Sequence, residues 1–401
     1  MAGNVFREIY RRHPSFRRLE EMLAANSAEP VTIHGLTGSS RSIVMAGALS
    51  QQPTTHVVLL PEKEEAAYFY NDLTSLMGDD NIFFFPGTYK RSVMYEQTEP
   101  ANIILRAEVL NFLSSGRRKC IIVSYPESVM EKVISKTSLK KNTFFIKKGA
   151  KLSIEFLEEV LREYNFQRTD FVYEPGQYAI RGSITDLFSY STDKPYRIDF
   201  FGEEVDSIRS FSPDDQLSLQ LHDEIQVIPD IQLLAFQENA DSFIDFIPPS
   251  SIIWSDSFDY IVEKTDNIWE QACSRSLKGE ISDRSDIIIT GRHLEELCSR
   301  HRRIFFGRGR HNPDTVNIAF RTEPQPAFNK NFGLLASKLA SNVQDGYTNF
   351  IISESEVQKQ RLKEIFEESD PAVQFTPLLL NLHQGFTDHD LKIAVYTDHQ
   401  I

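Results

Sequence analysis

The stretch GLTGSSRS, which begins at Gly35, has the spacing of a loop that binds nucleotide phosphates. Such P-loops follow the pattern G-x-x-x-x-G-K-[ST], in which glycine lets the backbone approach the phosphates, lysine reaches the outer phosphates and the hydroxyl holds magnesium. Gly35 and Ser42 fit the pattern, and Gly38 adds a second flexible position. Ser40, however, stands in place of the second glycine and Arg41 in place of lysine. The loop therefore has the outline of a nucleotide site with altered chemistry.

A nucleotide hydrolase also needs acids at the end of a neighbouring strand, which hold the metal and orient the attacking water. The best match is IIWSDSF, which supplies Asp256 without an adjacent glutamate. Two altered motifs favour a structural relic, so we expect no ATP hydrolysis and no cofactor for this chain. Weak nucleotide binding or hydrolysis at the degenerate P-loop stays an alternative. The sequence also lacks HExxH and CxxC metal-ligand spacings and the G-x-S-x-G nucleophile motif.

A second group of residues suits protein recognition rather than catalysis. In YRIDFF, residues 196–201, strand alternation places Arg197, Asp199 and Phe201 on the face opposite Phe200 and the other apolar residues. Exposed arginine and phenylalanine on rigid strands are residue types that dominate the binding energy of protein interfaces. The alternative is an ordinary sheet in which Arg197 pairs with Asp199 across strands and Phe201 is partly buried. The strand pattern alone favours neither interpretation.

The elements that must position these residues change character along the chain. Short apolar strands at 30–36, 55–61, 81–87 and 119–127 alternate with helical stretches, which predicts a largely parallel sheet. From about residue 142, strands follow one another with hairpin-like turns, which indicates an antiparallel insert. The strand and helix alternation then returns, with a further strand expected in DIIIT before the helix GRHLEELCSR.

The predicted fold class is therefore α/β and multidomain. It comprises a degenerate P-loop (helicase-like) parallel-sheet domain with an inserted, mainly antiparallel α+β domain, followed by a separate small α/β domain. The expected boundaries are 1–130 and 223–322 for the two halves of the first domain, 131–222 for the insert and 323–401 for the last domain. Because the chain stops directly after a strand, we also expect it to be part of a longer protein.

Composition limits the classes of function. The net charge of −14 argues against a general nucleic-acid binder, because binding to a duplex rests on cations that neutralise phosphates. A DNA-damage contact through the basic stretch SRHRRIFFGRGRH, residues 299–311, stays an alternative. No apolar run approaches the roughly 20 residues that span a membrane, and the three cysteines lie far apart. We expect a cytoplasmic, monomeric protein without membrane contact.

A longer pattern covers residues 174–216. It reads E-P-G-x-[FY]-A-x-R-G-x-x-x-D-[LI]-F, then P-Y-R-[LI]-[DE]-F-F, then [DE]-S-[IL]-R-x-F. This pattern resembles the UvrB-like module of bacterial transcription-repair coupling factors, and the excinuclease protein UvrB itself. UvrB carries an intact GSGKT loop, a DESH-type acid strand and a long β-hairpin for damaged DNA. Here the loop and acid strand are altered and GTYKRSVMYEQTEP, residues 87–100, takes the hairpin's place. The coupling factors therefore fit better.

The resemblance implies a function in DNA repair. In the family, the insert docks the excinuclease protein UvrA, and the interface residues correspond to Arg181, Arg197 and Phe201. The arginines would make charge-assisted, bidentate contacts to carboxylates, and Phe201 would supply apolar area. The complete protein would displace RNA polymerase stalled at a lesion by ATP-driven translocation on DNA, using Mg and a motor outside this chain. This chain would carry only the recruitment of nucleotide excision repair.

Overall fold

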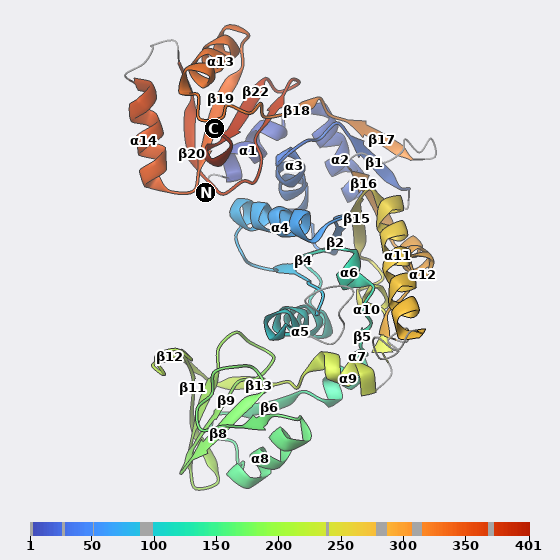
Figure 1. Ribbon diagram of the computed structural model, residues 1–401, viewed down its shortest axis with the longest axis vertical. Helices are drawn as coiled ribbons and strands as arrows, with labels where there is room; N and C mark the ends of the chain where they lie inside the picture. The colour runs from blue at the N-terminus through green and yellow to red at the C-terminus, as the bar shows by residue number, and fades with distance from the viewer. Residues whose placement is uncertain are drawn as a thin grey trace.

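The computed structural model describes residues 3–25, 29–50, 52–88, 99–237, 240–277, 287–306, 315–367 and 373–401. They form an elongated molecule, with a large parallel sheet in the middle, an antiparallel insert at one end and a small third unit at the other (Figure 1). The predicted multidomain α/β fold class is confirmed. Within these residues, no helix combines the length and the apolar character that crossing a membrane requires.

The central unit is built on a seven-stranded sheet in the order β17-β1-β16-β15-β2-β4-β3, in which every pairing is parallel. Its strands are β1 (Val31–His34), β2 (Thr55–Leu59), β3 (Ile82–Phe84), β4 (Cys120–Ser124), β15 (Ile252–Asp256), β16 (Arg302–Phe306) and β17 (Val316–Ala319). Most of these strands are short runs of buried apolar residues, as expected where helices cover both faces of a parallel sheet.

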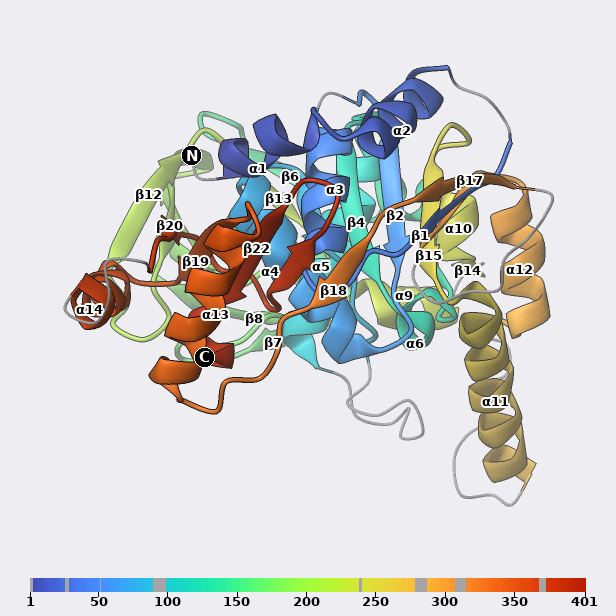
Figure 2. The same cartoon turned by 90° about the horizontal axis from the view of Figure 1, so that it is seen from above.

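Two groups of helices cover the faces of this sheet. One hydrophobic core contains α1 (Gly3–Tyr10), α2 (Pro14–Ala24), α3 (Ser40–Leu49) and α4 (Lys63–Met77). The other contains α5 (Pro100–Ser114), α10 (Phe243–Phe246), α11 (Phe258–Leu277) and α12 (Gly291–Ser299). Shorter elements complete this side: α6 (Pro126–Val129), α7 (Lys136–Lys141), α9 (Ile231–Gln237) and the strand pair β5 (Val133–Ile134) with β14 (Ala240–Asp241). Figure 2 shows α11 and α12 on the side of the molecule away from α14 (Glu356–Glu367) of the third unit.

One expected strand is absent from the sheet. In the described part of DIIIT, Ile288 makes only an isolated bridge to Glu131. The place beside β15 belongs instead to β16, which lies within the basic stretch and buries Ile304 and Phe306. The basic stretch is most simply interpreted from its sequence as a solvated helix end and strand; the strand is present, but two of its apolar residues are buried while the arginines at its start can extend toward solvent.

The insert forms a six-stranded sheet in the order β12-β11-β10-β9-β8-β7. Its strands are β7 (Gln167–Arg168), β8 (Gln177–Arg181), β9 (Ile184–Leu187), β10 (Tyr196–Phe201), β11 (Glu204–Phe211) and β12 (Ser218–His222). All neighbours pair antiparallel except β7 and β8. Helix α8 (Ile154–Glu163) covers one face, where Leu157 and Leu161 share a core with Ile198 and Phe200. We call the opposite side of the sheet the outer face.

Strand pairing places the boundaries of the insert later than the predicted 131–222. Strand β13 (Glu224–Val227) pairs antiparallel with β6 (Phe144–Lys147), and both contribute to the core of the insert. Residues 131–141 belong to the central unit instead, because β5 pairs with β14 and Leu139 is buried in the central core. The pairing partner of a strand is distant in sequence, so the local pattern could not assign these segments.

The third unit has its own five-stranded sheet, in the order β18-β21-β22-β19-β20. Its elements are β18 (Thr322–Pro324), α13 (Phe332–Gln344), β19 (Thr348–Ser353), α14 (Glu356–Glu367), β20 (Thr376–Leu379), β21 (Phe386–Asp388), β22 (Ile393–Thr397) and the 3-10 turn Asp398–Gln400. One side of this sheet joins the core of the central unit, where the rings of Phe6 and Phe350 lie 5.4 Å apart. The third unit is therefore packed firmly against the central unit.

Candidate partner-binding site and the degenerate P-loop

The degenerate P-loop lies between β1 and α3, so the predicted strand–loop–helix context is confirmed. Gly35 and Gly38 have φ angles of +77° and +53°, which glycine adopts without strain. The backbone of Gly35 is also packed closely, since a Cβ there would collide with the carbonyl oxygen of Phe320. The loop has kept its backbone shape, but a neighbouring protein segment approaches it directly.

Groups of the loop that could cradle a phosphate are engaged by other parts of the chain. The amide of Thr37 donates to Thr322 Oγ1 at 2.9 Å, and the amide of Ser39 donates to the carbonyl of Gln384 at 3.1 Å. The hydroxyl of Ser39 accepts the amide of Gln384 at 3.0 Å. Ser40 turns inward and donates its hydroxyl to the Thr37 carbonyl at 2.6 Å. Residues of the third unit thus occupy hydrogen-bonding positions that a P-loop offers to phosphate.

The remaining polar side chains of the loop are paired as well. Arg41 Nη1 forms an ion pair with Asp256 Oδ2 at 2.6 Å, so the two residues that replace the catalytic lysine and acids neutralise each other. Ser42 donates to Asp72 Oδ2 at 2.8 Å, while Asp72 Oδ1 accepts the amide of His383 at 2.7 Å. Burial raises the pKa of Asp72. The polar groups of the loop therefore take part in a hydrogen-bonded cluster that connects the central and third units.

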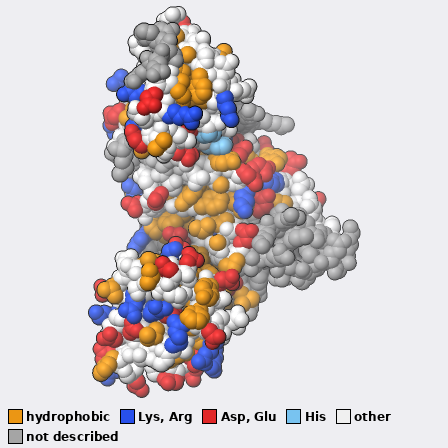
Figure 3. All heavy atoms as spheres, turned by 60° about the vertical axis from the view of Figure 1, so that its left-hand side comes forward, with side chains coloured by type: hydrophobic (Ala, Val, Ile, Leu, Met, Phe, Trp, Pro, Cys, Tyr) orange, Lys and Arg blue, Asp and Glu red, His pale blue; other side chains and the backbone are white. Residues whose placement is uncertain are grey.

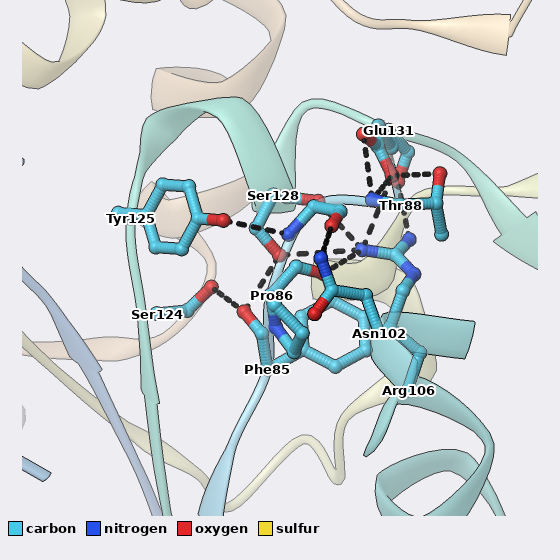
Figure 4. Close-up of polar contacts among 10 residues, drawn as sticks. Phe85, Pro86, Thr88, Asn102, Arg106, Ser124, Tyr125, Ser128 and Glu131 are labelled. Atoms are coloured by element: carbon cyan, nitrogen blue, oxygen red, sulfur yellow. Dashed lines mark hydrogen bonds and ion pairs between the residues drawn. The ribbon is translucent and has the colours of Figure 1, made fainter. Parts of the chain in front are cut away.

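The segment that replaces the UvrB hairpin lies largely outside the described residues, which exclude 89–98. The two residues that flank it are held together, because the amide of Glu99 donates to the Thr88 carbonyl at 2.8 Å. Glu131 accepts the Thr88 amide at 3.1 Å and pairs with buried Arg106 at 3.4 Å (Figure 4). The guanidinium of Arg106 lies 4.2 Å from the centre of the Phe85 ring. This buried network fixes both ends of the segment.

On the outer face of the insert, a single carboxylate holds two of the predicted site residues. Asp186, whose side chain is fully buried, is the register partner of Arg197 and accepts its Nε at 2.7 Å and its Nη2 at 2.8 Å. The same carboxylate pairs with Nη2 of Arg181, which lies at the end of β8. Arg181 Nη1 also donates to the carbonyl of Asp170 at 2.8 Å. The structure therefore brings Arg181 and Arg197 together.

Asp186 was not among the predicted site residues, although it is the aspartate of the longer sequence pattern. The alternative interpretation, in which Arg197 pairs with Asp199 across strands, is wrong, since Asp199 pairs with Arg209 at 2.7 Å instead. The hydrogen bond to Asp186 raises the pKa of Arg197, whose guanidinium also lies 4.5 Å from the centre of the Phe211 ring. Arg197 is consequently oriented by its own sheet and retains 16% side-chain exposure.

Phe201 lies free on the surface at the end of β10. It is 84% exposed, whereas its neighbour Phe200 is 5% exposed and belongs to the insert core. The predicted alternation is confirmed, and the alternative of a partly buried Phe201 is wrong. A register shift opposite Asp199 and Phe200 is absorbed by β11, so β10 itself stays regular. In Figure 3, the lower lobe is the insert, and basic and hydrophobic side chains lie side by side on it.

The basic stretch falls only partly within the described residues, which end at 306 and resume at 315. In its described part, Arg300 pairs with Asp245 at 3.3 Å, and Arg302 donates to the carbonyl of Met22 at 2.7 Å. These arginines make intramolecular contacts, and residues 307–311 of the stretch lie outside the described residues.

Among the described residues, one cluster has residue types that could ligate a metal ion: His13, Asp388 and Asp390. His13 Nδ1 accepts the amide of Ser15 at 3.0 Å, which places the ring hydrogen on Nε2, 3.3 Å from Asp390 Oδ2. Asp388 accepts the hydroxyl of Tyr10 at 3.0 Å. Since a metal would need the lone pair of Nε2, the arrangement fits a polar connection between the N-terminal helices and the third unit.

A comparison with protein families finds a match to the insert. The family model of the UvrB interaction domain matches residues 144–232. The match begins at the first residue of β6 and includes β13, which agrees with the boundaries that strand pairing gives.

The chain is also similar to complete repair proteins. It is 30% identical to the transcription-repair-coupling factor of Bacillus subtilis over 202 residues, which is 50% of this chain and 17% of that protein. It is 27% identical to the factor of Escherichia coli over 209 residues, 52% of this chain and 18% of that protein. It is 23% identical to UvrABC system protein B of Thermotoga neapolitana over 227 residues, 54% of this chain and 34% of that protein. The matched part of the chain spans less than a fifth of the length of the Bacillus subtilis and Escherichia coli coupling factors.

Proposed function

We propose that this chain is the repair-recruitment part of a transcription-repair coupling factor and that its UvrB interaction domain binds UvrA. The observation that carries the proposal is the combination of an 84% exposed Phe201 with two arginines held by one buried carboxylate, on the outer face of that domain. An exposed aromatic and ordered guanidinium groups on one face of a sheet are residue types that dominate the energetic centres of protein interfaces.

The geometry also describes how such a site would work. Because Asp186 already takes two donors of Arg197, a partner carboxylate would meet the remaining N–H groups rather than form a new bidentate pair. Arg181 is more accessible, at 39% side-chain exposure, and is the better candidate for a direct charge-assisted contact. Ordering the arginines before binding reduces the side-chain entropy that association would otherwise cost.

In this proposal the chain recruits excision repair but does not hydrolyse ATP. The engaged amides of Thr37 and Ser39 and the pairing of Arg41 with Asp256 support that expectation. Displacement of RNA polymerase by ATP-driven translocation would belong to other parts of a full-length protein. Nucleotide hydrolysis and DNA-damage binding, the two alternatives, have no comparable support among the described residues.

The test is direct binding of purified UvrA to this chain by calorimetry, with Phe201→Ala as the interface variant. Val357→Ala is the matched control, because Val357 is also highly exposed, at 80%, but lies in the third unit. We expect binding by the chain, competition by added UvrB, weaker binding for Phe201→Ala and unchanged binding for the control. Failure of the unmodified chain to bind UvrA would refute the proposal.

A further inference from the structure

Exposed apolar side chains are concentrated in the insert. Of the 16 large hydrophobic residues that are exposed in the described part of the chain, eight lie between residues 144 and 227, about a fifth of the sequence. Phe201 is one of them, and three others lie close together at the far edge of the same sheet: Leu217, Leu219 and Leu221, at 64%, 55% and 73% exposure. Clustered apolar exposure of this kind marks interaction surfaces.

Strand register places Leu221 on the outer face, on the same side of the sheet as Arg197 and Arg209. Asp186 pairs with Arg197, Arg197 pairs with Arg209, and Arg209 pairs with Leu221. Directly paired residues of antiparallel strands project to the same side of a sheet. Leu221 therefore continues a row across four strands that also contains Asp186, Arg197 and Arg209.

The opposite edge of the outer face also carries apolar surface. Phe171 and Tyr173, which precede β8, are 52% and 56% exposed, and the guanidinium of Arg181 lies 5.1 Å from the centre of the Phe171 ring. The cationic centre of the face is thus flanked by aromatic side chains on one edge and leucines on the other. Such a surface complements a partner with acidic groups between two apolar regions.

The local structure of β12 disfavours simple strand addition at this edge. The register shifts between Ser210 and Phe211, where their partners are Gln220 and Ser218, so Leu219 is an extra residue in a bulge. Bulges and short edge strands protect a sheet against pairing with another strand. A partner would therefore contact the side chains of β12 rather than extend the sheet through its backbone.

We propose that UvrA covers the outer face as far as β12, with Leu221 as an apolar contact beside Arg197 and Arg209. The inference rests on the proposed function and extends it to a specific boundary of the interface. Two strand spacings of about 4.8 Å separate Arg197 from Leu221, or roughly 10 Å. An interface that buries about 800 Å² on each partner is wide enough to include both Phe201 and Leu221.

The experiment compares the affinity of UvrA for four forms of the full chain: unmodified, Leu221→Asp, Leu221→Ala and the control Val357→Asp. We expect Leu221→Asp to weaken binding about tenfold or more, because it places an unpaired charge in an apolar contact, and Leu221→Ala to weaken it by less. Val357→Asp introduces the same charge at a similarly exposed aliphatic residue outside the insert and should leave the affinity unchanged. Melting curves verify that the variants are folded.

The outcomes separate this inference from the function on which it rests. Loss of affinity for both Leu221 variants, with the control unchanged, supports the extended interface. If Phe201→Ala weakens binding but both Leu221 variants bind as tightly as the unmodified chain, the interface ends before β12 and the inference is overturned while the proposed function stands. If the unmodified chain does not bind UvrA, the proposed function itself fails.

Discussion

Asp186 and Arg197 face each other in register on β9 and β10, with two hydrogen bonds of 2.7 and 2.8 Å between carboxylate and guanidinium. Because Asp186 is buried and also pairs with Arg181, it is a positioning residue for the candidate site. It determines where the two cations lie and limits how many of their donors remain for a partner. Removing its charge should therefore disturb both arginines.

Asp186→Asn should destabilise the insert by about 2–3 kcal/mol, somewhat less than the roughly 3–5 kcal/mol typical of breaking a buried ion pair, because both arginines keep some solvent contact. Chemical denaturation monitored by circular dichroism measures the change. Asp193→Asn is the matched control, since Asp193 is 81% exposed and 3.9 Å from Lys194. Equal stability of the two variants would show that Asp186 does not hold the arginines in solution.

Phe201→Ala should affect partner binding and Phe200→Ala should affect stability, although the two residues are neighbours in sequence. Loss of the exposed Phe201 should weaken UvrA binding by about 30-fold, or about 2 kcal/mol, without changing stability. Loss of the buried Phe200 should lower the free energy of unfolding by about 3–5 kcal/mol. Calorimetric titration and thermal melting distinguish the two. A collapse of stability in Phe201→Ala would contradict its assignment as a surface residue.

The double variant Ser40→Gly with Arg41→Lys should not create ATPase activity, even though it restores the P-loop pattern. Thr37 and Ser39 would still donate their amides to Thr322 and Gln384, and Asp256 would still lack a neighbouring acid. Phosphate release and binding of a fluorescent ATP analogue provide the measurements. Sustained hydrolysis by this variant would mean that the loop is not a relic.

Gly35→Ala should destabilise the chain more than Gly116→Ala. Both glycines have similar positive φ, at +77° and +81°, so both variants carry backbone strain of about 1–2 kcal/mol. Only at Gly35 would the new Cβ also meet backbone, at the carbonyl oxygen of Phe320, and such overpacking adds about 1–3 kcal/mol. Thermal melting of the two variants measures both losses of stability, and their difference gives the effect of the close contact at Gly35. Similar losses would indicate that Phe320 can move away.

Stability should fall as the pH drops below the normal pKa of histidine, in part because of His56. Burial, with a smaller contribution from Arg302, lowers the pKa of His56 from 6.5 to about 3. The unfolded chain takes up a proton near pH 6.5 that the folded chain does not, so folding becomes less favourable as pH falls from there toward 3. Between about pH 7.5 and pH 5 the loss from this residue should be about 2 kcal/mol.

His56→Asn checks that assignment. The asparagine oxygen can replace Nδ1 as acceptor for Trp254 Nε1, a hydrogen bond of 3.1 Å, but it does not titrate. Denaturation at several pH values should give a shallower acid slope for this variant. His293→Asn, at a site with 47% side-chain exposure, is the control and should retain the slope of the unmodified chain.

Local sequence determined much of the fold and part of the site. The degenerate P-loop could be recognised because its spacing, glycines and flanking apolar runs all lie within a few residues of one another. The opposite orientations of Phe200 and Phe201 followed from the two-residue period of a strand, which depends only on backbone geometry. The alternation of strands and helices likewise indicated the parallel sheet before any contact was known.

Tertiary structure alone decided which distant groups meet. Nothing in the local pattern assigns β13 to β6 rather than to the central unit, because strand partners are chosen by a shared core and not by sequence proximity. The same holds for Asp186, which outcompetes Asp199 for Arg197 because it is the buried register partner on the adjoining strand. The degenerate P-loop is closed by Gln384, some 345 residues away, since packing of the third unit brings its backbone onto the loop amides.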